Sequence, residues 1–178
     1  ELNDINNLGI TLDASTFNVA IINPILKSNS LTFSGLYNLH LNINNVFSLD
    51  AFDGKLNILN LRINKMNYGR FDIAFNLKDP NEPINLSVSN NYKETSIAVN
   101  GSINIPLSSN YTLPKYDFNL IGNVTGFQLY FLESFISSIS QTKGTLSGPI
   151  KIYRQNKKIY LDGDCVTSDA STKINYLN

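Results

Sequence analysis

The chain has 178 residues, the length of one ordinary domain, and its 14 basic residues balance 14 acidic ones to give a formal net charge of zero. Nucleic-acid-binding proteins concentrate positive charge, so this balance argues against nucleic acid as a partner. The single cysteine, Cys165, excludes an internal disulfide framework, and no stretch reaches the roughly 20 apolar residues of a membrane-spanning helix. We treat residues 1–178 as a single fragment of a longer protein, with any signal or anchor outside it.

The first segment with a helical character lies within residues 18–31. Asn23 is suited to cap a helix and Pro24 to occupy its first turn, so the sequence predicts a short helix there.

Most of the chain alternates apolar and polar residues, the period of a strand with one apolar and one polar face. Phe71, Ile73 and Phe75 share one parity, whereas Asp72 and Asn76 share the other. Such segments follow one another closely along the chain, which predicts an antiparallel meander. The apolar parity comprises Leu39, Leu41, Ile43, Leu56, Ile58, Leu61, Ile63, Phe71, Ile73, Phe75, Leu86, Val88, Ile97, Val99, Ile103, Ile105, Phe118, Leu120, Ile150, Ile152, Ile159 and Leu161.

Several positions interrupt the alternation or separate its segments. The apolar parity shifts by one at Leu59 and then continues to residue 63, which predicts a β-bulge inside one long strand. Gly101 and Gly148 lie inside alternating runs, where glycine marks a bulge or a bend of the sheet. The pairs Asp53-Gly54 and Asn90-Asn91 are typical of turns.

A second helical segment is predicted over residues 127–140. Leu129, Leu132, Phe135 and Ile139 recur there at spacings of three and four, as on one face of an amphipathic helix. Two short helices cover little of a long sheet, whose apolar face normally lies under a second sheet or a helical layer. Either the sheet folds over on itself, or the face stays open for an apolar ligand.

The sequence lacks the residue groupings that catalysis or metal binding needs. His40 is the only histidine, lies on the polar parity, and has no His or Cys nearby in sequence. No Gly-x-Ser-x-Gly motif occurs, and Asp162-Gly163-Asp164 lacks the further oxygen ligands of a calcium loop. We therefore expect no enzyme, no catalytic residue, no metal and no cofactor, and we expect Cys165 to be a half-buried strand residue.

One local excess of positive charge lies near the C-terminal end. It comprises Lys143, Lys151, Arg154, Lys157 and Lys158. Lysines on a hairpin protect a sheet edge from pairing, and the same charges suit phospholipid headgroups. The sequence alone leaves both interpretations open.

Residues 131–136 suit a short helix, residues 143–152 read Lys-Gly-Thr-Leu-Ser-Gly-Pro-Ile-Lys-Ile, and two further strands follow at 159–164 and 173–178. Phe33-Ser34-Gly35 and residues 66–71 show related features in the first half. In these segments the chain resembles the AsmA-like family, specifically its TamB group of translocation and assembly module proteins. Residues 153–158 depart from the Gly-Thr that the family usually has there, which puts the geometry of that hairpin in question.

The resemblance implies a mainly β fold: a long, curved antiparallel sheet forming an open half-pipe, or β-taco, with an apolar interior and one or two short helices. It also implies a periplasmic location in Gram-negative bacteria, with an inner-membrane anchor outside this segment. The implied function is movement of phospholipid between the inner and outer membranes, with acyl chains in a groove lined by the apolar residues given above. The alternative is a scaffold for outer-membrane protein assembly with a TamA-type barrel.

Overall fold

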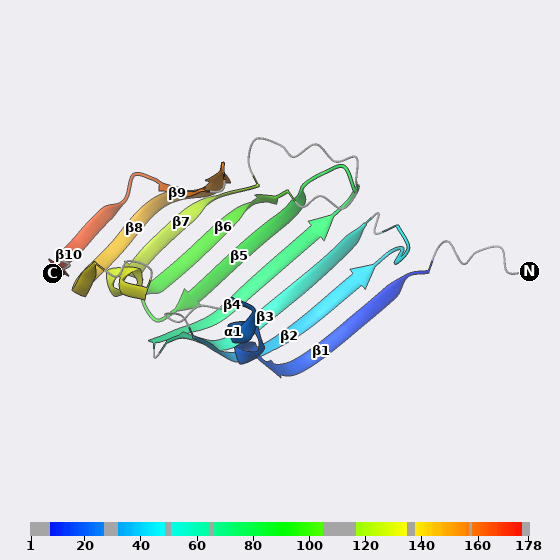
Figure 1. The fold of residues 1–178 in the computed structure, drawn as a ribbon, viewed down its shortest axis with the longest axis horizontal. Coiled ribbons are helices and arrows are strands. Elements are labelled where there is room, and N and C mark those ends of the chain that lie inside the picture. Colours follow the sequence, from blue (N-terminus) through cyan, green and yellow to red (C-terminus); the bar gives the residue numbers. More distant parts are fainter. Residues whose placement is uncertain are drawn as a thin grey trace, which may run out of the picture.

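A computed structural model describes residues 8–26, 32–48, 51–64, 66–104, 117–134, 138–156 and 158–175 of the chain. These residues form one antiparallel sheet of ten strands (Figure 1). The strands are β1 (Ile10–Asn18), β2 (Phe33–Ile43), β3 (Phe52–Ile63), β4 (Met66–Leu77), β5 (Ile84–Tyr92), β6 (Thr95–Ile103), β7 (Phe118–Gln128), β8 (Ile139–Gln155), β9 (Lys158–Asp162) and β10 (Val166–Ile174). The helical segments within the described residues are η2 (Val19–Ile22), α1 (Asn23–Leu26) and η3 (Leu129–Ser134).

The strands follow the meander that their spacing predicts. From β1 to β8, each strand pairs with the next one along the chain. The long strand β8 pairs with β7 on one side, and on its other side with β10 along one half and β9 along the other. The sheet is therefore open, with β1 at one edge and β9 and β10 at the other (Figure 1). The expected mainly β fold with an open antiparallel sheet and short helices is confirmed.

The register of the strands gathers the apolar residues on one face. Residues opposite each other in an antiparallel pair point to the same side of the sheet. Leu39 pairs with Leu56 and Leu56 with Ile73, and the same row continues through Val88 to Val99. We call this side, with its rows of aliphatic and aromatic side chains, the apolar face.

The predicted bulge in β3 is present, but it begins one residue later than expected. Asn60 has a φ of 52°, and the pairing with β4 shifts between Ile58 and Leu61. Leu59 pairs with Leu36 on the opposite face, so Leu59 does not continue the apolar face. The extra residue Asn60 returns Leu61 to that face, opposite Gly69.

Both predicted turns lie inside strands. Asp53 and Gly54 belong to β3, where the ring of Phe75 occupies the space of a side chain at Gly54: a Cβ there would lie 2.4 Å from Cζ of that ring. Asn90 and Asn91 belong to β5, and the turn comes later, at Lys93, whose φ is 57°. Glycine and asparagine favour turns locally, but pairing with neighbouring strands overrides that preference here.

The two glycines that were expected to bend the sheet behave differently. Gly148 has a φ of 141°, a conformation that L-residues rarely adopt, and therefore fits a local irregularity of β8. Gly101 lies in regular pairing with β5 and β7, so of the two predicted alternatives, a bulge or a bend, the bulge is absent there. Its role is close approach, because a Cβ at Gly101 would lie 1.9 Å from the carbonyl oxygen of Asn119.

The predicted N-terminal helix is present as two short segments with a different cap. The side chain of Asn18 accepts a hydrogen bond of 2.9 Å from the backbone N–H of Ala20 and caps η2. Asn23 is instead bound to the backbone of Phe33: its Nδ2 donates to the carbonyl at 3.0 Å, and its Oδ1 accepts from the N–H at 2.8 Å. These two bonds hold the segment against β2.

The second predicted helix is shorter than residues 127–140. Phe127 and Gln128 pair with Leu146 and Thr145, so the first two positions belong to β7, and Ile139 already belongs to β8. Residues 135–137 lie outside the described part of the chain. The helical part is the 3₁₀ segment η3, which is held to β8 by a hydrogen bond from the Thr142 N–H to Oε1 of Glu133.

The molecule exposes more surface to solvent than a compact monomer of the same mass. The accessible area is 12088 Å², whereas a compact monomer of 19.8 kDa exposes about 8,600 Å² by the usual scaling with mass. One buried cluster joins Val19 of η2 to Leu61, Ile63 and Tyr68. A second buried cluster joins Val99, Val124 and Ile150 on strands β6, β7 and β8. Between these clusters the sheet is a single layer.

Candidate functional site

The apolar face is a continuous surface across the described strands that could bind a ligand. Every predicted face residue in the described part of the chain lies on it, and Ile105 lies outside that part. The residues on the face are Leu39, Leu41, Ile43, Leu56, Ile58, Leu61, Ile63, Phe71, Ile73, Phe75, Leu86, Val88, Ile97, Val99, Ile103, Phe118, Leu120, Ile150, Ile152, Ile159 and Leu161.

Solvent contact varies along this face. Leu61 and Ile63 are only 7% and 8% exposed, because Val19 of η2 and neighbouring aromatic side chains cover them. Most other face residues of β2 to β7 are half-buried, among them Leu56 and Ile73. At the far edge, Ile159 and Leu161 on β9 are 69% and 62% exposed. Half-buried apolar side chains in adjoining rows leave an apolar surface available to a ligand.

Asn90 and Arg154 are polar residues on the apolar face, and the alternation did not predict them. Asn90 pairs with Phe71 and Ile97, and it is 5% exposed. Its Nδ2 donates hydrogen bonds of 2.7 Å to the carbonyl oxygens of Tyr68 and Arg70. These carbonyls flank Gly69, where β4 has left its pairing with β5, so Asn90 replaces hydrogen bonds that the ladder no longer provides.

Arg154 lies on this face opposite Phe118 and Ile159. Its Nε lies 3.2 Å from Oδ2 of Asp117, which places an ion pair at the margin of the apolar rows. Two other members of the predicted basic group, Lys151 and Lys158, lie on the opposite face. Lys151 pairs with Ile121 and Asp162 on the opposite face, and Lys157 lies outside the described residues.

A cavity of about 430 Å³ lies at one end of the apolar face, and we call it the tyrosine cavity. Its residues come from β4, β5, the turn after β5, β7 and η3, and include Tyr68, Tyr92, Lys93, Glu94, Phe127 and Tyr130. Asn90 lines it as well, so the cavity adjoins the row that contains Phe71 and Ile97. Sequence reasoning missed it, because its residues are far apart in the chain.

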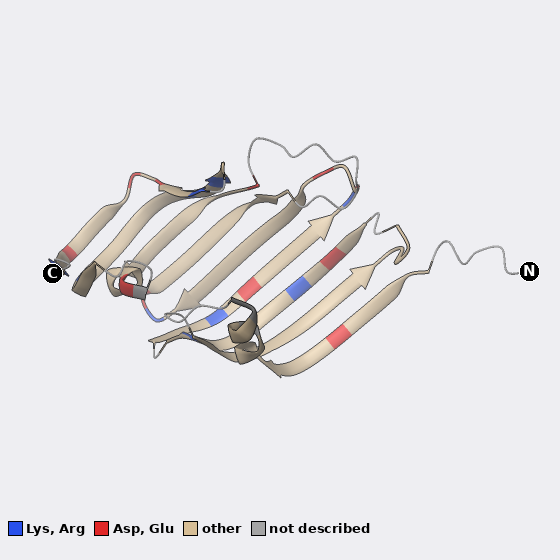
Figure 2. Cartoon of the chain, in the orientation of Figure 1, with Lys and Arg blue, Asp and Glu red and all other residues tan. Residues whose placement is uncertain are grey.

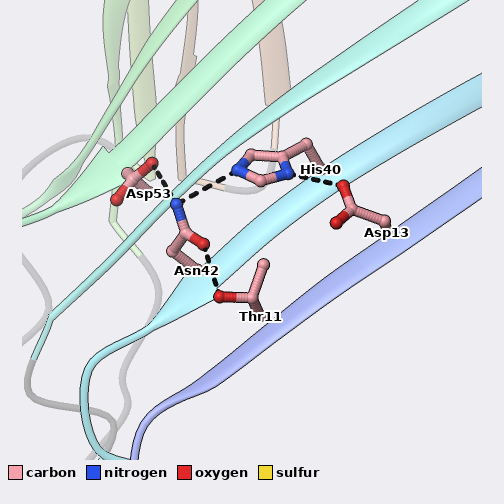
Figure 3. A network of polar contacts seen from close by, with 5 residues as sticks. All are labelled: Thr11, Asp13, His40, Asn42 and Asp53. Carbon is pink, nitrogen blue, oxygen red and sulfur yellow. Dashed lines mark hydrogen bonds and ion pairs between the residues drawn. The ribbon is translucent and has the colours of Figure 1, made fainter.

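The opposite face of the sheet is polar and carries no catalytic grouping in the described residues. His40 is 45% exposed, and its Nδ1 lies 2.6 Å from Oδ1 of Asp13 (Figure 3). Asn42 lies 3.2 Å from Nε2 of His40 and accepts a hydrogen bond from Thr11. This exposed network matches the prediction that His40 points to water, and within the described chain no three His, Cys, Asp or Glu residues are placed to hold a metal ion.

Charged residues are unevenly distributed over the sheet (Figure 2). The strands β5, β6 and β7 contain none, and their polar face is made of asparagine, serine and threonine together with a few apolar residues. On β4, Nε of Arg70 donates a 2.8 Å hydrogen bond to Asp72, and this bond is the main reason that the pKa of Asp72 is lowered. An open hollow of about 630 Å³ lies over small polar residues such as Asn85, Ser87 and Asn100.

Cys165 is half-buried, as predicted, but it lies between β9 and β10 rather than in a strand, and its Sγ donates to the carbonyl oxygen of Pro149 at 3.3 Å. Among the described residues, no helix is both long and apolar enough to cross a membrane.

No protein-family model matches the chain, and no curated protein or solved structure is detectably similar to it.

Proposed function

We propose that this chain carries phospholipid acyl chains on its apolar face, as part of a protein that moves phospholipid between two membranes. The observation that supports this proposal is the continuous, half-exposed apolar surface that runs across the strands of a single-layer sheet. A face meant only for folding would be covered by a second layer. An acyl chain provides such a layer and can move along it.

The energetics suit transport more than tight capture. Each buried CH₂ group contributes roughly 0.8 kcal/mol, so a chain of about 16 carbons gains on the order of 10 kcal/mol when fully buried and roughly half of that on an open face. Ordering the chain on the protein offsets part of this gain. The contact is spread over many side chains, so no single residue holds the lipid in place.

The resemblance to the TamB group of AsmA-like proteins supports the same proposal. It extends the proposal to a protein of the Gram-negative periplasm, anchored in the inner membrane through a segment outside this chain. In that setting the polar face contacts water, and the two sheet edges adjoin further strands of the longer protein. The chain then acts passively, without catalytic residues, metal or cofactor.

A pair of neighbouring substitutions on β4 tests the proposal. Ile73→Asp places a charge on the apolar face, whereas Ala74→Asp places the same charge on the polar face, because Ala74 pairs with Lys55 and Ser87. We expect wild type and Ala74→Asp to copurify with phospholipid, detected by mass spectrometry, and Ile73→Asp to lose most of it. Circular dichroism must show that both variants are folded. Absence of phospholipid from the folded wild type, or equal amounts in all three proteins, would contradict the proposal.

Exposed sheet edges favour a second candidate, a scaffold that pairs nascent outer-membrane strands and passes them to a TamA-type barrel. Every described residue of β10 is exposed, including Val166 at 71% and Ile174 at 58%. Strand addition needs a free edge rather than an apolar face. Thr167→Pro on β10 therefore weakens scaffolding while leaving bound lipid unchanged, whereas Ile73→Asp has the reverse effect.

A further inference from the structure

The tyrosine cavity has aromatic walls that are held in fixed positions. The ring of Phe131 lies edge to face against both Tyr68 and Phe127, with centroid distances of 5.3 Å and 5.2 Å. The ring of Tyr92 lies over Gly69, where a Cβ would come within 2.3 Å of it. Because these rings are packed on their outer sides, the shape of the cavity is preformed.

Three phenol groups converge on this cavity. Burial, and to a smaller extent the neighbouring Tyr130, raises the pKa of Tyr68. Burial and then Tyr92 raise the pKa of Tyr130 in the same way. The phenols of Tyr68 and Tyr130 therefore stay neutral near pH 7, and all three tyrosines present electron-rich ring faces and hydroxyl groups to the cavity.

The rim of the cavity carries one charge of each sign. Lys93 and Glu94 are neighbours in the turn after β5, and both line the cavity. Nζ of Lys93 lies 5.3 Å from the centroid of the Tyr92 ring, so an ammonium group already lies over one of these aromatic faces. A purely anionic ligand would meet Glu94, and a purely cationic ligand would meet Lys93. A ligand with both charges fits the pair.

We propose that the tyrosine cavity binds the headgroup of a zwitterionic phospholipid, with the ammonium group against the tyrosine rings and Glu94 and the phosphate near Lys93. The placement of the acyl chains rests on the proposed function: they extend from the cavity past Asn90 onto the row of Phe71 and Ile97. Aromatic rings with a nearby carboxylate are a recurring arrangement for binding ammonium groups.

Vesicles of phosphatidylethanolamine and phosphatidylglycerol in equal amounts provide the test. The protein is incubated with them and isolated again, and the amount of each lipid bound is measured by mass spectrometry. We expect wild type to favour phosphatidylethanolamine by about threefold, the size of a modest cation–π contribution. Glu94→Gln and Tyr92→Leu lower that ratio towards one. The matched control Glu82→Gln, an exposed acid outside the cavity, keeps the wild-type ratio.

A titration with water-soluble glycerophosphoethanolamine separates this proposal from the proposed function. We expect the headgroup to shift the tyrosine ring resonances of wild type in NMR spectra, and Glu94→Gln to weaken that response. Lipid bound without preference, together with no NMR response, would overturn the headgroup site and leave the acyl-binding face standing. An NMR response in a protein that binds no lipid would support the headgroup site and overturn the proposed function.

Discussion

At the scale of single residues, glycines make room for neighbours that the sheet could not otherwise accept. Gly101 lies opposite Leu86 on one side and Leu120 on the other, at a place where the adjoining strand comes very close. The missing side chain lets regular pairing continue from β5 to β7. The requirement at this position is steric, because Gly101 does not have a positive φ.

Gly101→Ala tests that requirement. The added methyl group would lie 1.9 Å from the carbonyl oxygen of Asn119, so the backbone has to shift, and we expect the free energy of unfolding to fall by about 2 kcal/mol or more. Gly9→Ala is the control, because its nearest neighbouring atom would be 3.3 Å away, and we expect less than about 1 kcal/mol. Urea denaturation followed by circular dichroism measures both. Equal effects of the two substitutions would refute the steric account.

Tyr68 gives the fold a specific sensitivity to alkali. The pKa of its phenol is raised in the folded protein, chiefly by burial, so the folded state needs the neutral form. This contribution is fully present below the unfolded-state pKa of about 10 and is lost as the pH rises above it. We expect Tyr68→Phe to lose less stability than wild type between about pH 9 and about pH 11. Urea denaturation measures the free energy of unfolding of each protein at alkaline pH relative to its own value at neutral pH. Equal losses in the two proteins would show that Tyr68 does not ionise on unfolding in this range.

At the scale of elements, the helical segments cover one end of the apolar face. Val19 of η2 and Tyr130 and Phe131 of η3 pack with the buried cluster around Tyr68 on β4. The segments precede β2 and β8, which are far apart in the chain. Both nevertheless pack against the same cluster on β3 and β4. They close that end of the face, and η3 forms part of the tyrosine cavity through Tyr130.

Phe131→Ala tests the contribution of η3. It removes a ring that contacts both Tyr68 and Phe127, and we expect a loss of about 2–3 kcal/mol in the free energy of unfolding. Phe47→Ala is the control, because Phe47 is 65% exposed, and we expect a change below about 0.5 kcal/mol. If Phe131→Ala were as mild as the control, η3 would not be a packed element.

The sequence predicted the strands and the apolar face well, for a physical reason. Side chains alternate across a strand with a period of two, and an uninterrupted period such as Phe71, Ile73 and Phe75 fixes both the strand and the side to which its residues point. The turns were less predictable: Gly54 looked like part of a turn, but it makes room for Phe75 from the neighbouring strand. The residues next to Gly54 in the sequence do not show that Phe75 of another strand needs this space.

The tyrosine cavity could not be predicted at all. Tyr68, Tyr92 and Tyr130 come from β4, β5 and η3, and only the strand register and the position of η3 bring them together. Asn90 lies on the apolar parity of its strand and breaks the pattern there. Its two hydrogen bonds to the bulged part of β4 explain its place, but they become evident only when the pairing is known.

At the scale of the whole molecule, the single-layer sheet has two faces of opposite character and two free edges in its described part. On the central strands β5 to β7 the polar face has no charged side chains, and most residues of the apolar face are half-buried, whereas Val99 and Val124 are buried. The proposed function places lipid on the apolar face only. It therefore predicts that Leu86 and Val88 of β5, which share that face, contact lipid, and that Ser87 on the other face contacts water.

Site-specific photo-crosslinking on β5 tests this central claim most directly. A photoreactive amino acid replaces Leu86, Ser87 or Val88 in turn, in cells that produce the protein, and crosslinked phospholipid is detected by mass spectrometry after irradiation. The account predicts phospholipid adducts at Leu86 and Val88 and none above background at Ser87. Adducts of equal yield at all three positions, or no adduct at Leu86 and Val88 in folded protein, would contradict it.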